Sequence, residues 1–351
     1  MATVRFGVIG AGQIAQSSCK DIQSHPDAEL VAASDIDAPR LKDLADNFAI
    51  GRTYSDAADL MADADVDALY IGVPNAFHAP LAKAGLEAGK HVILDKPFAL
   101  NIAEAEGVAA AARASGKTFM LGMNQRFRAE SQVIRNLVRE GALGEVYHAK
   151  AFWFRRSGIP KLGTWFGKKK LAGGGALLDI GVHLLDLALY AAGNFKPVSV
   201  SGATYTKFGN RGLGEGGWGM SEPTEMDFDV DDFATALIKF EGGLTVTLDV
   251  SWAIHQADAN RMNVHLFGTE AGAGIYPAEL YRYGAEPGSY DVVEKPEGKV
   301  DYPHENRFHN FINALLGNEE PCVGVDESLA IQKILDGIYE SCASGKEVRI
   351  A

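Results

Sequence analysis

The first third of the chain alternates short apolar runs with stretches in which apolar residues recur at helical spacing. The Ala-rich stretches 76–88 and 102–115 predict helices. The apolar runs, which predict buried strands, cover 4–9, 29–33, 67–73, 91–94 and 118–122. Because strands and helices alternate through short connections, we expect an α/β domain with a parallel, doubly wound sheet and right-handed crossovers.

The pattern changes after about residue 124. Helical spacing at 129–140 and 176–192 precedes a series of long alternating or β-branched runs. Those runs cover 198–206, 233–240, 244–252 and 262–268. The segment EGG at 241–243 predicts a hairpin between two of them, and the Gly-rich stretch 207–228 predicts a long loop. We therefore expect an α+β domain with a large open, mostly antiparallel sheet and helices on one face.

The change of pattern predicts two domains, covering residues 1–123 and 124–351. A helical pattern at about 325–343 is expected either to stay with the second domain or to pack back on the first. A sheet with one uncovered face commonly buries it against another subunit. We therefore expect a homodimer or homotetramer that forms through the open sheet.

The composition argues against several classes of function. The 351 residues are 47% hydrophobic and carry a formal net charge of -13, which argues against a nucleic-acid partner because phosphates would be repelled. No run approaches the roughly 20 apolar residues of a membrane span, and the N-terminus lacks the basic start of a leader. Three well-separated cysteines predict free thiols rather than disulfides or a metal site. The expected location is cytoplasmic.

The first strand runs directly into GAGQIA at 10–15, a G-x-G-x-x-A pattern that opens a helix. Gly10 suits the tight turn, Gly12 lets backbone approach a pyrophosphate, and Ala15 allows close packing of helix on strand. Gln13 and Ile14 begin the helix and are expected beside the phosphates. In this strand–turn–helix context the motif predicts a dinucleotide site.

Asp35 ends the next strand run, twenty residues beyond Ala15. A carboxylate at this place accepts hydrogen bonds from the ribose hydroxyls and repels a 2′-phosphate. NAD is therefore the expected cofactor. Arg40 could reach a phosphate, which leaves NADP as the less favoured alternative.

Lys96 follows the fifth strand run, at the edge of the predicted sheet where ligands bind. Alone it would be read as a surface cation. The stretch 175–187 is otherwise that of a buried helix, yet it holds Asp179, His183 and Asp186.

Asp179 and His183 are spaced i and i+4, so a helix brings their side chains together. Two other interpretations remain open: a core histidine satisfied by an aspartate, or half of a metal site that has no evident third ligand. Asp186 could share the same face or serve only as an ion-pair partner. The glycines at 173–175 would allow a ligand to approach the backbone closely.

Taken together, these segments resemble the Gfo/Idh/MocA family of the glucose–fructose oxidoreductase and inositol dehydrogenase type. The similarity extends over essentially the whole chain. It rests on GAGQIA at 10–15, VPNAFH at 73–78, DKPF at 95–98, NQRF at 124–127, GGGALLDIGVHLLD at 173–186 and ESCASGKEVRI at 340–350. The resemblance implies an oxidoreductase with an NAD(P)-binding Rossmann domain at 1–123 and a substrate-binding and oligomerisation domain at 124–351.

The resemblance also assigns roles by position. The family's catalytic residues fall on Lys96, Asp179 and His183. Residues that flank the cofactor fall on Pro74, Asn75, His78, Asn124 and Arg126, with Lys96 near both nicotinamide and substrate. Asp95 stands where the family usually has Glu, so a hydrogen bond made by the longer side chain is expected to be lost or re-routed.

The implied reaction moves a hydride between a secondary alcohol and nicotinamide, while the protein handles the hydroxyl proton. His183 is the expected general base, Asp179 would orient it, and Lys96 would stabilise the developing charge on oxygen. Whether Lys96 or His183 accepts the proton first stays open.

Arg126, Arg155 and Trp165 complete the expected substrate contacts. Aromatic residues near the catalytic helix in sequence favour a neutral sugar, anhydrosugar or cyclitol; a sugar phosphate, sugar acid or nucleotide sugar stays possible. They are Trp153, Trp165, Phe166 and Trp218. Two alternatives remain: an NAD-dependent glycosidase that oxidises transiently, and a non-catalytic sugar-sensing regulator of the same fold.

Overall fold

The computed structural model describes residues 3–219, 223 and 227–350. Contacts within the chain divide it into two compact units. The first consists of residues 1–123, 170–172 and 306–332, and the second of residues 124–169, 173–305 and 333–351. The chain therefore returns to its first unit after most of the second has been built.

The first unit contains a six-stranded parallel sheet in the order β3-β2-β1-β4-β5-β6. Its strands are β1 Val4–Ile9, β2 Ala28–Ser34, β3 Arg52–Tyr54, β4 Ala68–Ile71, β5 His91–Leu94 and β6 Phe119–Leu121. Its helices are α1 Gln13–Gln23, α2 Ala38–Phe48, α3 Ala57–Ala62, α4 His78–Glu87, α5 Ile102–Ser115 and α9 Arg307–Leu315. The predicted doubly wound sheet is confirmed.

Local chemistry explains where these helices start and stop. The side chain of Asp37 accepts a hydrogen bond from the backbone of Arg40 at the start of α2, and Asn101 does the same for Glu104 at the start of α5. Helix α5 ends at Gly116, whose φ of 64° is left-handed. The strand order reverses between β1 and β4, and ligands of such sheets bind at the carboxyl ends beside this point.

The second unit contains a nine-stranded sheet in the order β14-β13-β12-β11-β7-β10-β9-β8-β15. Its strands are β7 Val146–Arg155, β8 Pro197–Tyr205, β9 Phe233–Phe240, β10 Thr245–Ser251, β11 Asn260–Gly268, β12 Gly272–Gly274, β13 Glu279–Tyr283, β14 Tyr290–Glu294 and β15 Val348–Arg349. Strands β7 and β10 pair in parallel and the other neighbours are antiparallel. The expected mostly antiparallel sheet is confirmed, and the EGG segment at 241–243 joins β9 to β10 as predicted.

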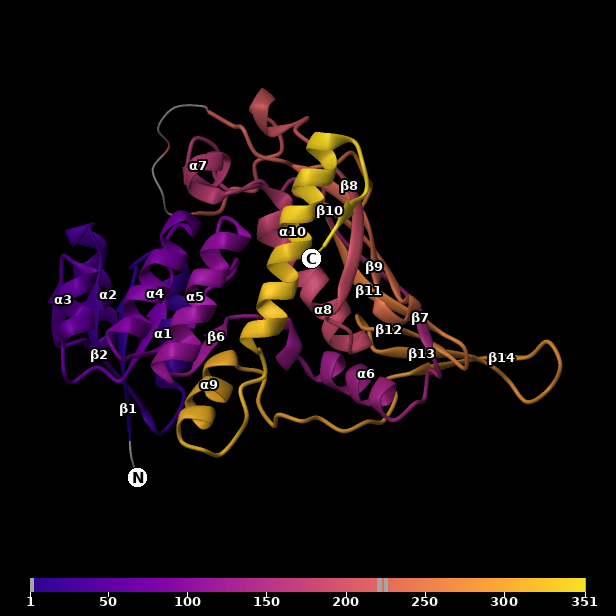
Figure 1. Ribbon diagram of the computed structural model, residues 1–351, viewed down its shortest axis with the longest axis horizontal. Coiled ribbons are helices and arrows are strands. Elements are labelled where there is room, and N and C mark those ends of the chain that lie inside the picture. The colour runs from indigo at the N-terminus through magenta and orange to yellow at the C-terminus, as the bar shows by residue number, and fades with distance from the viewer. Residues whose placement is uncertain (1–2, 220–222, 224–226, 351) are drawn as a thin grey trace. The chain divides into compact units, whose positions relative to one another are not determined.

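Helices α6 Ala129–Arg139 and α8 Val182–Ala192 lie together on one face of this sheet (Figure 1). A short helix, α7 Lys169–Ala172, precedes α8, and α10 Val325–Ser344 begins in the first unit and ends in the second. The helical segment 169–192 is long and apolar enough to cross a membrane, but 83% of its most apolar 18 residues are buried, as in a core helix. In the predicted loop 207–228 the chain makes one turn at Gly209–Arg211, and residues 220–222 and 224–226 lie outside the described residues.

The opposite face of the second sheet carries a row of aromatic rings. The rings of Phe154 and Phe233 are 6.3 Å apart and nearly parallel, and the rings of Phe152 and His265 are 6.0 Å apart. Tyr205 continues the row with an edge contact to Phe233 at 5.8 Å. These rings form an aromatic row on the face of the sheet that α6 and α8 do not cover.

Candidate active site

The turn from β1 to α1 has the geometry that a dinucleotide phosphate requires. Gly10 has a φ of +99°, and a Cβ atom there would lie 2.5 Å from the carbonyl oxygen of Gly72. A Cβ atom on Gly12 would meet nothing within 4 Å, so the backbone before α1 is open on its outer side. Gln13 and Ile14, the first residues of α1, are exposed. These features fit a pyrophosphate bound at the N-terminus of α1.

Asp35 lies directly after β2 and supports this turn. Its Oδ2 atom accepts a 2.6 Å hydrogen bond from the backbone nitrogen of Ala11, and its Oδ1 atom accepts one of 2.8 Å from the backbone of Asp37. Arg40, the cation that could have favoured NADP, is paired with Asp37 at 3.1 Å. The arrangement fits NAD, because a carboxylate rather than a free cation stands where the ribose hydroxyls would lie.

Lys96 occupies the turn after β5, where its bond to Pro97 is cis and its side chain is half-buried. The ring of His78, at the start of α4, joins this turn to the one after β4. Its Nδ1 atom is 2.7 Å from the carbonyl oxygen of Pro97 and its Nε2 atom is 2.9 Å from that of Val73. Burial lowers the pKa of His78, and a neutral ring donates to only one of the two oxygens at a time. His78 therefore helps to hold the turn that carries Lys96.

Asp95, which replaces the family's usual Glu, is buried in an ion pair. Arg307 donates 2.7 Å hydrogen bonds to its Oδ1 atom and to the carbonyl oxygen of Gly122, and the hydroxyl of Tyr70 donates to Oδ2 at 3.0 Å. Burial acts to raise the pKa of Asp95, but the charge and hydrogen bond of Arg307, with a further contribution from Lys96, leave it below its ordinary value. The shorter acid is therefore ionised and engaged by Arg307.

Pro74, Asn75 and Asn124, which were expected to flank the cofactor, lie in two different units. Pro74 and Asn75 follow β4 in the first unit, where the Asn75 amide donates a 2.8 Å hydrogen bond to the carbonyl oxygen of Ala172. Asn124 opens a short 3-10 turn in the second unit, and its side chain is exposed. The role of these three residues toward the cofactor stays a prediction.

Asp179 and His183 belong to the second unit and lie where a π-helical turn, Leu177–Gly181 (η4), runs into α8. Both side chains are half-buried although their neighbours in sequence are buried. The indole nitrogen of Trp252 donates a 2.8 Å hydrogen bond to Oδ2 of Asp179. The ring of His183 lies 6.3 Å from that of Trp153. A π-turn inside an otherwise regular helix is frequent at functional sites.

Arg155, predicted to bind substrate, lies beside these residues. Its guanidinium stacks over the ring of Trp153 at 4.5 Å. Burial lowers the pKa of Arg155, and the charge of Asp179 opposes that shift. The second unit thus gathers a histidine, a carboxylate, a cation and an aromatic face.

The start of the helix that carries Asp179 is held by a buried acid. The Asp231 carboxylate accepts hydrogen bonds from the backbone of Gly175 at 2.8 Å and of Leu177 at 2.9 Å, and from the hydroxyl of Tyr339 at 2.7 Å. A Cβ atom on Gly175 would overlap the carbonyl oxygen of Asp231, and one on Gly174 would overlap the Tyr339 hydroxyl. Gly174 and Gly175 therefore allow close contact between protein groups.

The position of Arg126 differs from the expectation that this residue binds cofactor and substrate. Its guanidinium and the Asp186 carboxylate are 0% and 1% exposed and are joined by hydrogen bonds of 2.5 to 3.0 Å. The rings of Tyr190 and Phe195 lie 5.1 and 5.2 Å from the guanidinium. A fully buried, paired guanidinium does not reach a ligand, so Arg126 supports the fold instead of binding cofactor or substrate. Asp186, whose role the sequence left open, is its partner.

Trp165 lies in an aromatic group formed by two loops of the second unit. Its ring stacks on that of Phe166 at 3.8 Å, and Phe166 meets the edge of Trp218 at 5.2 Å. The Trp218 indole nitrogen donates a 3.3 Å hydrogen bond to the carbonyl oxygen of Gly158. All three rings are half-buried, so part of their surface is available to a ligand.

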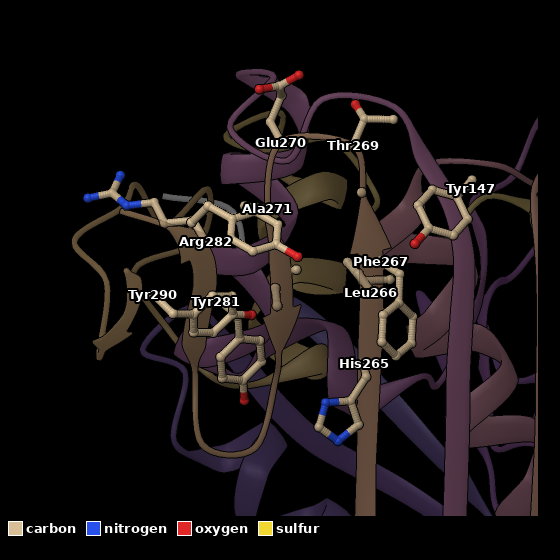
Figure 2. A pocket seen from close by; sticks show the side chains of 14 residues that line it. Tyr147, His265, Leu266, Phe267, Thr269, Glu270, Ala271, Tyr281, Arg282 and Tyr290 are labelled. Atoms are coloured by element: carbon tan, nitrogen blue, oxygen red, sulfur yellow. The ribbon is translucent and has the colours of Figure 1, made fainter. Parts of the chain in front are cut away.

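A cavity of about 340 Å³ lies elsewhere in the second unit, at the end of the sheet around β11 and β13 (Figure 2). Figure 2 shows the side chains of His265, Phe267, Tyr281 and Tyr290 around it. None of the residues predicted to bind cofactor or substrate lines this cavity. Within the described part of the chain no three His, Cys, Asp or Glu side chains gather as metal ligands.

Residues 4–123 match the family profile described as the oxidoreductase family with an NAD-binding Rossmann fold, and residues 131–273 match the GFO/IDH/MocA C-terminal domain. The chain is 30% identical to D-glucoside 3-dehydrogenase of Escherichia coli (strain K12), over 99% of this chain and 97% of that protein. It is 29% identical to D-apiose dehydrogenase of Paraburkholderia graminis, over 98% of this chain and 88% of that protein.

Among solved structures, levoglucosan dehydrogenase in complex with NADH and levoglucosan has the same fold. Its TM-score is 0.85 at 22% sequence identity, and the similarity covers 99% of each chain. GenD2 from gentamicin A biosynthesis, in complex with NAD, gives a TM-score of 0.80 at 24% identity, over 100% of this chain and 97% of that one.

Proposed function

The chain belongs to the GFO/IDH/MocA family of NAD-binding sugar oxidoreductases, and from this premise we propose that it transfers a hydride between nicotinamide and a secondary alcohol of a neutral sugar, anhydrosugar or cyclitol. One observation carries the proposal. In an otherwise buried helix, Asp179 and His183 are half-buried, and Asp179 is fixed by the indole of Trp252. A titratable pair held at a partly open place suits the removal of a hydroxyl proton.

When NAD is bound, it supplies the hydride acceptor. His183 takes the hydroxyl proton, because imidazole titrates near neutral pH. Asp179 orients the ring and stabilises its cationic form. Lys96 donates a hydrogen bond to the reacting oxygen as negative charge develops on it. This role for Lys96 is supported by its place at the carboxyl end of β5, on a turn that His78 and Asp95 hold.

Gly10, Gly12 and the first residues of α1, Gln13 and Ile14, would hold the pyrophosphate, and Asp35 the ribose. Pro74, Asn75, His78 and Asn124 are proposed to border the nicotinamide end. Arg126 is left out of this set because its guanidinium is fully buried.

The charges near Asp179 and the aromatic rings of the second unit favour a neutral substrate. Arg155 is stacked on Trp153 and faces the opposite charge of Asp179, so it offers little uncompensated charge to an anionic substrate. The faces of Trp165 and Trp218 suit the C–H faces of a sugar ring. The named relatives, a glucoside dehydrogenase and an apiose dehydrogenase, support the same class.

The aromatic face of the second sheet supports a homodimer or homotetramer. Tyr205 of this row is 43% exposed, and Leu237 on the same face is 40% exposed. Apolar patches of this kind mark protein–protein contacts, and a second copy of this chain is the proposed partner. Light scattering that gives the mass of a single chain would contradict this. A cytoplasmic location is proposed from the three free cysteines and would be checked by cell fractionation.

The activity is tested by incubating the protein with NAD and a panel of monosaccharides, anhydrosugars, inositols and sugar acids, and following the absorbance of NADH. His183→Ala is expected to lower kcat by roughly 100-fold or more while leaving the Kd for NAD unchanged. His309→Ala is the matched control, since this histidine lies on α9, is hydrogen-bonded to Ser24 at the end of α1, and has no proposed role in the reaction.

Unchanged turnover in His183→Ala would rule out the assignment of the base. A glycosidase would instead release an aglycone from a glycoside without net formation of NADH. A sugar-sensing regulator would bind NAD and show no turnover across the panel.

A further inference from the structure

Trp252 is a buried residue whose one polar atom points at the proposed reaction centre. It follows directly after β10, its side chain is 0% exposed, and its backbone nitrogen donates to the carbonyl oxygen of Asp232 at 2.9 Å. Indole nitrogen is a donor only, and a buried donor has to find an acceptor. The acceptor here is Oδ2 of Asp179, at 2.8 Å.

The strand and the helical turn that carry these two groups are in close contact. The π-turn η4, with Asp179 at its centre, packs on β10. A Cβ atom on Gly181 would lie 3.2 Å from a methyl carbon of Val250 on that strand, so glycine lets the two backbones approach. Asp231 anchors the start of the same helical run through its backbone. The distance from the Trp252 indole to Asp179 is therefore set by rigid elements on both sides.

We propose that Trp252 is a positioning residue: it keeps the Asp179 carboxylate ionised and directs its other oxygen toward His183. This inference rests on the proposed role of Asp179 in the reaction. Trp252 transfers no proton. A hydrogen bond to the charged form of an acid favours that form, and the fixed indole allows the carboxylate fewer orientations.

The test has to separate the effect of Trp252 on the pH profile from the effects of other charged groups near Asp179. Arg155 faces it from β7, and His183 lies on the same helical run. Asp231 lies at the start of that run, while Asp249 of β10 is bonded to Thr235 of the neighbouring strand. None of these groups is altered by a change at Trp252, so an effect of that change on the pH profile reports the bond to Asp179.

The experiment replaces Trp252 by Phe, which keeps an aromatic ring and removes the N–H group. In NAD-linked oxidation of the substrate found by the panel, kcat is expected to fall about tenfold, while KM and the Kd for NAD stay within about twofold. The acidic limb of the kcat/KM profile, which reports protonation of His183, moves to higher pH by roughly one unit, because an Asp179 carboxylate without the indole hydrogen bond attracts the protonated imidazole more strongly. Val246→Ala, a buried truncation on the same strand, is the control and keeps the position of that limb.

A double-mutant cycle with Asp179→Asn separates positioning from general loss of structure. Once the carboxylate is gone, Trp252→Phe is expected to cause no further loss of kcat. An equal loss in both backgrounds, or an acidic limb that stays in place, would overturn the proposal for Trp252. Full activity of Asp179→Asn would instead overturn the proposed role of Asp179, a distinct outcome. If Trp252→Phe fails to fold, benzothienylalanine at position 252 keeps the bicyclic shape without the N–H donor and gives the same readouts.

Discussion

The buried ion pair between Arg126 and Asp186 makes a sharp prediction about stability. The pair is almost fully excluded from solvent, and Arg126 reaches both carboxylate oxygens. Asp186→Ala leaves a buried guanidinium without its counter-charge, which costs about 3–5 kcal/mol. The rings of Tyr190 and Phe195 remain beside the cation, but these contacts, worth about 2 kcal/mol or more when desolvated, are already present in the native protein and do not offset the loss. The loss is therefore a large part of a domain's usual stability of about 5–15 kcal/mol.

Urea unfolding followed by tryptophan fluorescence measures this loss directly. All four tryptophans belong to the second unit, which also contains the ion pair, so the signal reports the unfolding of that unit. With a slope of about 2–3 kcal/mol per molar urea, the midpoint of Asp186→Ala is expected to fall by about 1–2.5 M. The double variant Arg126→Met with Asp186→Leu replaces the pair by apolar side chains and should recover most of the midpoint.

The same variants test whether Arg126 contacts a ligand. Because its guanidinium is 0% exposed, the folded double variant should bind NAD with unchanged Kd. The reasoning fails if Asp186→Ala loses less than about 1 kcal/mol, or if the double variant unfolds as early as the single one. A Kd for NAD that rises about tenfold in the stable double variant would restore Arg126 as a direct ligand contact.

Two further predictions follow from single residues. Gly175→Ala should lower the free energy of unfolding by about 1–3 kcal/mol, because its methyl group would overlap the carbonyl oxygen of Asp231. Gly107→Ala, at an open position within α5, should raise it by up to about 1 kcal/mol. Thermal unfolding compares the two variants, and equal Tm values would contradict the contact between Gly175 and Asp231. Asp95 has a lowered pKa in the folded protein, so it stabilises the fold above its ordinary pKa of about 4 and loses that contribution as the pH falls through the lower folded value. Asp95→Asn should therefore lower the Tm near pH 7 and flatten its decline toward about pH 3, and a variant with the native pH dependence would show that the pair with Arg307 contributes nothing.

Local sequence patterns predicted the elements whose apolar residues keep one period. Five strands of the first sheet and the helices at 78–87 and 102–115 fall where apolar runs and helical spacing place them, but the three-residue strand β3 was not predicted. Residues 269–324 carried no predicted element, yet they contain strands β12 to β14 and helix α9. Their strands are short and partly exposed, so no alternation long enough to recognise exists in the sequence.

Two residues of the site could not be predicted from the sequence, because their partners lie in distant parts of the chain. Arg307 lies 212 residues from Asp95, and Trp252 lies 73 residues from Asp179. No spacing rule connects such pairs, because they meet only when the chain returns to the first unit or when a strand packs on a helical turn. The one available signal was the departure at Asp95, where a shorter acid implied a different partner.

The polar residues within 175–187 show how burial separates structural from functional candidates in one helical run. Asp186 is fully buried, and its charge is balanced by Arg126, so the fold alone accounts for it. Asp179 and His183 keep part of their surface exposed, although the leucines beside them in the same helical run are fully buried. A charged side chain that stays partly exposed in such an apolar run does not contribute to the packing of the core. It is therefore among the half-buried residues, and not among the paired buried ones, that the groups able to meet a substrate have to be sought.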